Sequence, residues 1–337
     1  METGGFALQN YNVSSSHQRK ILMAAKDAFT EILNHTKTIT NGKIVIADYG
    51  CSEGKNSMEF LFFTLKKFRE NSSQSVFIIH NDLPENDWVK AYKTLLESQE
   101  SYIKIPDVYF SAIGRSFYSQ ILPNNSLHIG FSSASIHWLS QPLCAPDHAF
   151  PSSSDDLGFL ETASNIAHND LVTFLRHRHQ ELVDSGRLLL QFGDRNAKDT
   201  VLTMILQAAC ENLYNKGIIT DEEKRKITIP MYRRSNEEII RALDEVSGLF
   251  RVVSIDRIRT EWNTSDSEEE WKESVNQVKK FIGNLMRIPM SKAINRSGEN
   301  FEAIFLEFSK EVDSLAESAC AEYCIATYHS IVLEKIK

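Results

Sequence analysis

The sequence contains little cysteine and no long apolar run. Its five cysteines are scattered, and only Cys320 and Cys324 lie close together, with no second pair to complete a zinc site. A small, odd number of cysteines fits a reducing compartment better than a disulfide framework. No apolar run approaches the roughly 18 residues of a membrane span, and the first residues lack the charged-then-apolar plan of a signal peptide. We therefore expect a cytoplasmic protein with no membrane partner.

The chain also lacks an excess of positive charge. Its formal net charge is −8 at pH 7, which disfavours a nucleic-acid partner because phosphate backbones bind basic surfaces. With 42% hydrophobic and 24% charged residues, the composition is that of an ordinary globular protein. At 337 residues, the chain is long enough for one large domain, or for a core domain with a sizeable insertion.

The first part of the chain alternates between strand and helix patterns. Short apolar runs typical of buried strands occupy residues 44–47, 76–80, 127–131 and 187–192. Apolar residues at helical spacing occupy 17–33, 57–69, 86–98 and 156–184. This alternation predicts an α/β fold, with a mainly parallel sheet and helices on both faces.

The pattern changes after Gly193. Helical spacing is found at 199–247, 271–288 and 299–315, and strand-like runs are found at about 250–262 and 324–333. The second of these helices is expected to end before Pro289, because proline breaks a helix interior. We expect most of this helical material to cover the carboxyl edge of the sheet, where ligands bind in such folds.

Residues 43–56 are the most informative stretch of the chain. They read Lys-Ile-Val-Ile-Ala-Asp-Tyr-Gly-Cys-Ser-Glu-Gly-Lys-Asn. A β-branched run ends in Asp48, and a small polar loop containing Gly50 leads into a helical pattern, which is the layout of a cofactor cradle at the end of a strand. Asp82 ends the next apolar run, so two acids occupy the tips of successive strands. Alternatively, Asp48 belongs to an ordinary strand–helix turn and caps the helix.

Three cofactor classes compete for this cradle. A phosphate-binding P-loop needs four residues between its glycines and a hydroxyl residue after its lysine, but three residues separate Gly50 from Gly54, and Asn56 follows Lys55. A dinucleotide fold needs Gly-x-Gly-x-x-Gly, with an acid about 20 residues further on. An acid before the first glycine would repel a pyrophosphate. It attracts the amino group and sulfonium of S-adenosylmethionine (SAM), which the pattern therefore favours.

Several further segments resemble one known family. They are Gly4-Gly5, Tyr11 with Ser15, Asn81-Asp-Leu-Pro-Glu-Asn-Asp87, Gly114-Arg-Ser-Phe-Tyr118, Leu122-Pro-Asn-Asn-Ser-Leu-His128, Ser132-Ser-Ala-Ser-Ile-His-Trp-Leu-Ser-Gln141 and Glu222-Glu-Lys-Arg-Lys-Ile-Thr-Ile-Pro-Met-Tyr232. In this order, over nearly the whole chain, they resemble the SABATH family of SAM-dependent methyltransferases, named for its salicylate, benzoate and theobromine enzymes. The resemblance implies a Rossmann-like class I methyltransferase sheet with a mostly helical cap, SAM as cofactor and a homodimer.

The resemblance also divides the chain into three parts. Residues 1–198 are expected to form the SAM-binding α/β core with an N-terminal closing segment. Residues 199–298 are expected to form a mainly helical cap that binds substrate and includes one core strand, at about 250–262. Residues 299–337 are expected to supply the final helix and strand of the core.

Individual positions acquire roles by the same resemblance. The cofactor-binding positions are Tyr11, Ser15, Asp48, Gly50, Asn56, Asp82, Leu83, Ser116 and Phe117. Gln18 and Trp138 match the amide and indole donors that hold a substrate carboxylate, and His137 is a third substrate-binding candidate beside them. By local pattern alone, Trp138 would more often be core packing, Gln18 a solvated helix residue and His137 structural.

The predicted reaction needs no catalytic side chain. A carboxylic acid with a pKa of about 4 is ionised at pH 7, so no general base is required, and SAM carries its own electrophilic activation. The protein contributes positioning, which Gln18 and Trp138 can provide without neutralising the carboxylate. No metal is expected, although Asp194, after the 187–192 run, is a position at which a cation could bind.

Two substitutions in the expected substrate pocket depart from the family pattern. Ala134 stands where an aromatic residue is usual, which enlarges the pocket, and His137 stands where an apolar residue is more usual. We therefore predict a SAM-dependent O-methyltransferase that forms methyl esters of a small hydrophobic acid of the terpenoid, fatty or aromatic kind. Alternatives are an N-methyltransferase of a heterocycle, a SAM-binding protein without catalysis and, from the fold alone, an NAD-dependent oxidoreductase.

Overall fold

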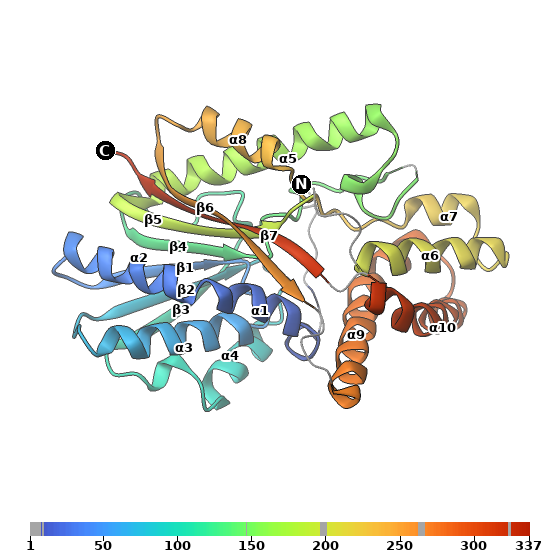
Figure 1. Ribbon diagram of the computed structural model, residues 1–337, viewed down its shortest axis with the longest axis horizontal. Coiled ribbons are helices and arrows are strands. Elements are labelled where there is room, and N and C mark those ends of the chain that lie inside the picture. Colours follow the sequence, from blue (N-terminus) through green and yellow to red (C-terminus); the bar gives the residue numbers. More distant parts are fainter. Residues whose placement is uncertain (1–7, 9, 146, 196–200, 262–266, 323–324) are drawn as a thin grey trace.

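The computed structural model describes residues 8, 10–145, 147–195, 201–261, 267–322 and 325–337, so that Gly4, Gly5 and Trp262 lie outside the described residues. Its centre is a seven-stranded sheet with the strand order β3-β2-β1-β4-β5-β7-β6 (Figure 1). The strands are β1 (Ile44–Tyr49), β2 (Val76–Asp82), β3 (Val108–Gly114), β4 (Leu127–Ser133), β5 (Leu182–Gly193), β6 (Phe250–Glu261) and β7 (Ile325–Lys335). Strands β1 to β5 are parallel, and β7 is antiparallel to both β5 and β6. The predicted, mainly parallel α/β sheet is confirmed.

Helices cover both faces of the sheet (Figure 1). One face carries α1 (Ser16–Ala24), α2 (Lys26–Ile39), α3 (Lys55–Arg69) and α4 (Trp88–Glu97), and the other carries α5 (Leu157–Glu181) and α8 (Asn236–Glu245). Three short 3-10 helices are η1 (Tyr11–Val13), η2 (Tyr102–Lys104) and η3 (Pro151–Ser153). The helix expected at 17–33 is two helices, because the chain leaves helical geometry at Ala25.

The central strands are apolar at nearly every position because helices cover them on both sides. Every residue of β1 is buried, and so are most residues of β2 and β4. Strand β3, which the sequence patterns did not reveal, lies at the edge of the sheet, and its residues are mostly part-exposed. An edge strand needs no continuous apolar run, so β3 lacks the signal that identifies its neighbours.

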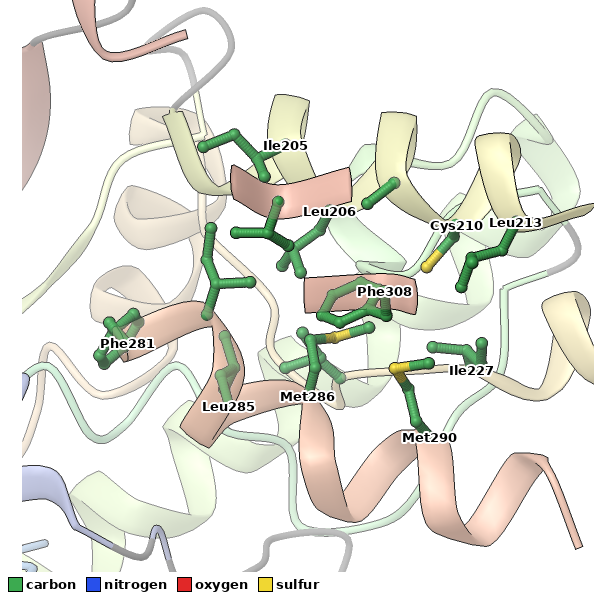
Figure 2. Packing of buried hydrophobic residues seen from close by; sticks show 14 of the residues in the cluster. Ile205, Leu206, Cys210, Leu213, Ile227, Phe281, Leu285, Met286, Met290 and Phe308 are labelled. Atoms are coloured by element: carbon green, nitrogen blue, oxygen red, sulfur yellow. The ribbon is translucent and has the colours of Figure 1, made fainter. Parts of the chain in front are cut away.

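Four helices pack together beyond the carboxyl ends of the parallel strands (Figure 1). They are α6 (Val201–Asn215), α7 (Asp221–Lys226), α9 (Glu268–Ala293) and α10 (Gly298–Glu322). Buried side chains of α6, α9 and α10, among them Leu206, Met286 and Phe308, form a hydrophobic core separate from the two that flank the sheet (Figure 2). These helices form the cap, which has an interior of its own. No helix in the described part of the chain is both long and apolar enough to cross a membrane.

Three expectations about the late helices differ from the structure. The helix expected at 299–315 as part of the core is α10, which packs in the cap on α6 and α9. Helix α8, expected in the cap, packs on α5 and the sheet through Ile239 and Leu243. Helix α9 continues through Pro289 to Ala293, because Pro289 and Met290 are buried in the cap core and packing outweighs the missing hydrogen bond.

Candidate functional site

A cavity opens at the carboxyl ends of β1, β2 and β4. This main cavity has an open volume of about 660 Å³. It is lined by Leu8, Tyr11, Gly50, Ser52, Asp82, Leu83, Ser116, Phe117, Tyr118, Ala134, Ser135, Trp138, Leu139 and Ser140. The structure therefore brings most of the predicted cofactor positions to the lining of one cavity, together with Trp138.

A smaller side cavity adjoins the main cavity. Its lining includes Gln18, Asp48 and Asn56, and its open volume is about 320 Å³. Tyr11 and Gly50 line both cavities, so the two hollows meet at these residues. The predicted cradle residues and Gln18 thus line the same cavity.

Asp82 is held by the loop that follows β1. The backbone N–H of Ser52 donates to its Oδ2 at 2.7 Å, and the backbone N–H of Leu83 donates to its Oδ1 at 2.8 Å. Burial raises the pKa of Asp82 to about 6, and the nearby charge of Asp48 acts in the same direction, while the two N–H groups oppose the rise. Each oxygen keeps a lone pair, so an ionised Asp82 can accept two further hydrogen bonds, such as those of vicinal hydroxyls.

Asp48 belongs to a buried chain of hydrogen bonds. His80 Nδ1 lies 3.0 Å from Asp48 Oδ2, and His80 Nε2 lies 2.8 Å from the Tyr102 hydroxyl. An ionised Asp48 accepts from His80 Nδ1, and the Tyr102 hydroxyl completes the chain at Nε2. Asp48 also lines the side cavity.

The same region contains a cluster of metal-binding atom types. Asp48, Cys51 and His80 each place one such atom within 4.8 Å of the others. Both ring nitrogens of His80 are already hydrogen-bonded, and burial raises the pKa of the Cys51 thiol well above its usual range, with Asp82 and Asp48 adding to the rise. We therefore interpret this cluster as a hydrogen-bond network around Asp48.

Gly50 occupies a position that no other residue can fill without a shift. Its φ is +88°, and a Cβ added there would lie 2.3 Å from Ser135 Oγ. The Ser135 hydroxyl donates to Gly50 O at 3.0 Å, and Gly50 N donates to Asn81 O at 2.8 Å. The loop after β1 is thereby fastened to β2 and to the loop after β4, and Gly50 lines both cavities.

The N-terminal segment closes over this cradle. Asn12 donates through its backbone N–H to Glu53 Oε2 at 2.9 Å, and Asn56 Nδ2 donates to Ser15 Oγ at 3.1 Å. Burial raises the pKa of Tyr11, and the neighbouring Tyr328, Asp82 and Asp48 add to the rise, so its hydroxyl stays protonated. Ser15 supports Asn56, whereas Tyr11 itself lines both cavities.

The two predicted carboxylate donors lie on neighbouring walls and not on one. Trp138 lines the main cavity, where its carbonyl accepts from the Tyr118 hydroxyl at 2.6 Å. Gln18 lines the side cavity, is 8% exposed and has no hydrogen-bond partner for Oε1 among the described residues. This amide oxygen can accept a hydrogen bond from a donor group of a ligand, whereas binding of a carboxylate needs the amide N–H₂.

His137 lies away from both cavities, although it precedes Trp138. It lines a third cavity, the cap cavity, between the sheet edge and α6, with an open volume of about 470 Å³. The other lining residues are His17, Phe150, Gly193, Leu202, Thr203, Met231, Arg233, Ala326, Thr327 and Tyr328. His17, Arg233 and Tyr328 were not identified from the sequence. Only the adjacency of His17 to Gln18 could have indicated one of them.

Asp194 is satisfied by side chains of the neighbouring strands. It is 2% exposed, its Oδ2 lies 3.2 Å from Arg257, and its Oδ1 lies 3.2 Å from His329. The cationic side chain of Arg257 therefore already occupies the position beside Asp194 at which a bound cation was considered.

Three features together define a Rossmann-like SAM-dependent methyltransferase. They are the mainly parallel sheet, the acids at two strand tips and the cap over the carboxyl edge. A solved structure described as loganic acid methyltransferase with SAH matches with a TM-score of 0.77 at 20% identity, covering 100% of this chain and 99% of that one. The chain belongs to the SAM-dependent carboxyl methyltransferase family, whose model matches residues 1–336.

Two curated relatives illustrate the family. The benzoic acid/salicylic acid carboxyl methyltransferase 2 of Petunia hybrida is 26% identical over 288 residues, which cover 79% of this chain and 80% of the relative. The salicylate carboxymethyltransferase of Clarkia breweri is 26% identical over 306 residues, which cover 84% and 83%. The predicted family, enzyme class and cofactor are confirmed.

Proposed function

We propose that the main and side cavities together hold SAM, and that the methyl acceptor is the carboxylate of a small acid with a hydrophobic body. The observation that carries the proposal is the pair Asp48 and Asp82, two neighbouring acids on the walls of adjoining cavities. Two acids so close together favour a cationic ligand. Gly50 lines both cavities, so a ligand there can approach its backbone closely.

Each predicted position receives a role in this proposal. Asp82 accepts from the ribose hydroxyls, and Leu83, Ser116 and Phe117 line the wall beside the adenine. Asp48, Gly50 and Asn56 surround the amino-acid end, and Tyr11, supported through Ser15 and Asn56, closes the site. When bound, SAM supplies a methyl group that its sulfonium activates toward a nucleophile.

The acid is positioned by neutral donors. The Gln18 amide and the Trp138 indole bind the carboxylate without neutralising it, so the attacking oxygen keeps its nucleophilicity. The carboxylate is ionised at neutral pH, and no side chain needs to remove a proton. One O–CH₃ bond forms as one S–CH₃ bond breaks, and the electron pair stays on the sulfur.

The cap cavity provides room for the body of the acid. Phe150, Leu202 and Met231 give it apolar walls. Two of its lining residues, His17 and His137, directly precede Gln18 and Trp138 in the chain. Ala134 leaves further space in the wall of the main cavity. These features support an acid larger than benzoate, of the terpenoid, fatty or larger aromatic kind.

The reaction is tested by the chemistry of its product. Methyl transfer from labelled SAM to a panel of carboxylic acids is expected to give products that release labelled methanol in alkali, because methyl esters hydrolyse readily. Label that survives alkali would identify N-methylation of a heterocycle instead.

SAM binding is expected to weaken as the pH falls through about 6. Burial raises the pKa of Asp82 to about 6, so the carboxylate accepts two hydroxyl donors above this pH and becomes protonated below it. The Kd for SAM should rise toward tenfold per pH unit on the acid side. Titration calorimetry between pH 5 and 8 measures this.

Two variants accompany this titration. Asp82→Asn should bind weakly at every pH and lose the dependence. Asp87→Asn, at the exposed N-cap of α4, should behave like the wild type. A pH-independent Kd in the wild-type protein would contradict the role of Asp82.

We also infer that the enzyme works in the cytoplasm as a homodimer. Cys51, Cys144 and Cys210 carry free thiols, which supports a reducing compartment. Two arguments support the homodimer: the resemblance to the family implies one, and two-fold dimers are the commonest oligomers of soluble proteins. Light scattering after size-exclusion chromatography measures the assembly.

A further inference from the structure

The segment that joins β3 to β4 lines the main cavity without belonging to a helix or strand. Residues 115–126, all of which the structure describes, lie between the two strands, and Ser116 and Phe117 line the cavity. An irregular backbone has no helix or sheet to satisfy its N–H and C=O groups, so these groups need other partners. The shape of this part of the cavity wall therefore depends on contacts from outside the segment.

A fully buried ion pair at the end of α5 supplies several of these contacts. Arg178 and Glu181 are both 0% exposed, and Arg178 Nη2 donates to Glu181 Oε1 at 2.7 Å. Arg178 Nη1 donates to Phe117 O at 2.7 Å, and Nη2 donates to Ser119 O at 2.9 Å. The planar fork of the guanidinium thus holds two carbonyl groups of the segment and one carboxylate.

Glu181 holds the next part of the segment and also the first strand. Its Oε1 accepts from the backbone N–H of Ile121 at 2.6 Å and from that of Leu122 at 3.1 Å. Its Oε2 accepts from the Tyr49 hydroxyl at 2.7 Å. Tyr49 ends β1 and directly precedes Gly50. The ion pair therefore links the segment after β3 to the strand that leads into the Gly50 loop.

Aromatic rings around Arg178 continue this support toward the cavity. The guanidinium carbon lies 4.3 Å from the centre of the Tyr49 ring and 4.9 Å from that of Phe174, distances typical of cation–π contacts. The Phe174 and Phe117 rings meet edge to face, with their centres 5.8 Å apart. Phe117, which lines the main cavity, is therefore held by α5 at its ring and by Arg178 at its carbonyl.

Stability of the fold alone gives little reason for this ion pair. Taking two charges out of water costs free energy that can exceed what their attraction returns, so a buried ion pair is weak evidence of stability. Glu181 is also the last residue of α5, where the helix dipole disfavours a carboxylate. The geometry that the pair imposes on residues 117–122 accounts for its presence.

We propose that Arg178 and Glu181 are positioning residues for the cofactor, and that they hold Ser116 and Phe117 in the arrangement that receives the adenine of SAM. This inference rests on the proposed function, which places the adenine beside these two residues. Arg178 and Glu181 are not among the described residues that line the main or the side cavity, so they act through the segment and without contact to the ligand. Their influence is confined to the nucleoside end of SAM.

Adenosine, which lacks the amino-acid end of SAM, tests this inference. Arg178→Lys keeps the charge but loses the planar fork, so the Kd for SAM should rise roughly tenfold, as expected for one lost charge-assisted hydrogen bond. The Kd for adenosine should rise by the same factor. Asp48→Asn should weaken SAM binding and leave adenosine binding unchanged. Displacement of labelled S-adenosylhomocysteine measures both ligands. An adenosine Kd that Arg178→Lys leaves unchanged overturns the inference.

Two further variants and a kinetic readout separate positioning from general stability. Glu181→Gln keeps the shape of the side chain, should act like Arg178→Lys, and replaces it if the lysine variant does not fold. Arg176→Lys, at an exposed position on α5, is the matched control and should bind like the wild type. In the first two variants the KM for SAM should rise, while kcat and the KM for the acid stay within about twofold. A lower kcat with an unchanged KM for SAM would indicate only a loss of folded enzyme, and it contradicts the inference.

The proposed function can fail separately from this inference. A wild-type enzyme that binds SAM and adenosine but methylates no acid contradicts carboxyl methylation, and the binding test of Arg178 still decides the inference. Adenosine binding that Asp82→Asn leaves unchanged would instead contradict the placement of the nucleoside in the main cavity, and the inference would fail with it.

Discussion

Substituting Asp48 with asparagine is expected to weaken SAM binding by roughly 100- to 1000-fold. Two opposite charges about 4 Å apart at a partly screened site interact by about 4 kcal/mol, and the substitution removes this attraction from the amino-acid end of the ligand. Asparagine has the same shape, and its oxygen can still accept the hydrogen bond of His80 at this 3%-exposed position. The loss should therefore come from charge and not from collapse of the site.

Titration calorimetry with SAM measures this effect. Asp27→Asn removes a carboxylate whose side chain is 98% exposed, and it is expected to bind SAM normally. Circular dichroism and thermal unfolding should show both variants folded. An unchanged Kd in Asp48→Asn would mean that Asp48 faces no cationic group of the ligand, and its role would then be confined to the hydrogen-bond chain with His80 and Tyr102.

Substituting Gln18 with glutamate is expected to lower kcat/KM for the acid by at least roughly 100-fold. The change replaces an amide that can donate to the substrate with a carboxylate that repels it, in a buried position where like charges are poorly screened. The Kd for SAM should stay the same or decrease, because Gln18 and Asp48 line the same cavity and a second acid attracts a cation. The variant thus separates acid binding from cofactor binding.

Initial rates at saturating SAM, together with the Kd for SAM, measure this separation. Gln99→Glu introduces the same charge at an exposed position and should retain wild-type kinetics. Gln18→Leu, which removes the donor without adding charge, should have an intermediate rate. Wild-type turnover in Gln18→Glu would place the substrate carboxylate elsewhere, and Trp138 would remain as the only proposed donor.

Much of the sheet could be predicted because its central strands are covered on both sides. Strands β1, β2 and β4 had to be apolar along their length, and Asp48 and Asp82 stand out because each acid ends such a run. Edge strand β3 has mixed burial and gave no such signal. Helix α9 passes through Pro289 because burial in the cap core offsets a local cost, which sequence spacing cannot indicate.

The cap cavity could not be predicted, for a different physical reason. His17, Arg233 and Tyr328 come from distant parts of the chain and meet only when α1, β7 and the segment before α8 converge. Each residue taken alone is an ordinary polar side chain. The position of His137 was visible beside Trp138, but its orientation away from the main cavity depends on the turn after β4, where Ala134 has a φ of +54°.

The most direct measurement is a crystal structure of the enzyme with S-adenosylhomocysteine and the best acid of the panel. We predict that Asp82 accepts from the ribose hydroxyls and that Asp48 faces the amino group. The acid's carboxylate should lie between the Gln18 amide and the Trp138 indole, with an oxygen directed at the sulfur. An acid bound with its reacting carboxylate away from Gln18 and Trp138, or a ligand amino group distant from Asp48, would contradict the proposed site.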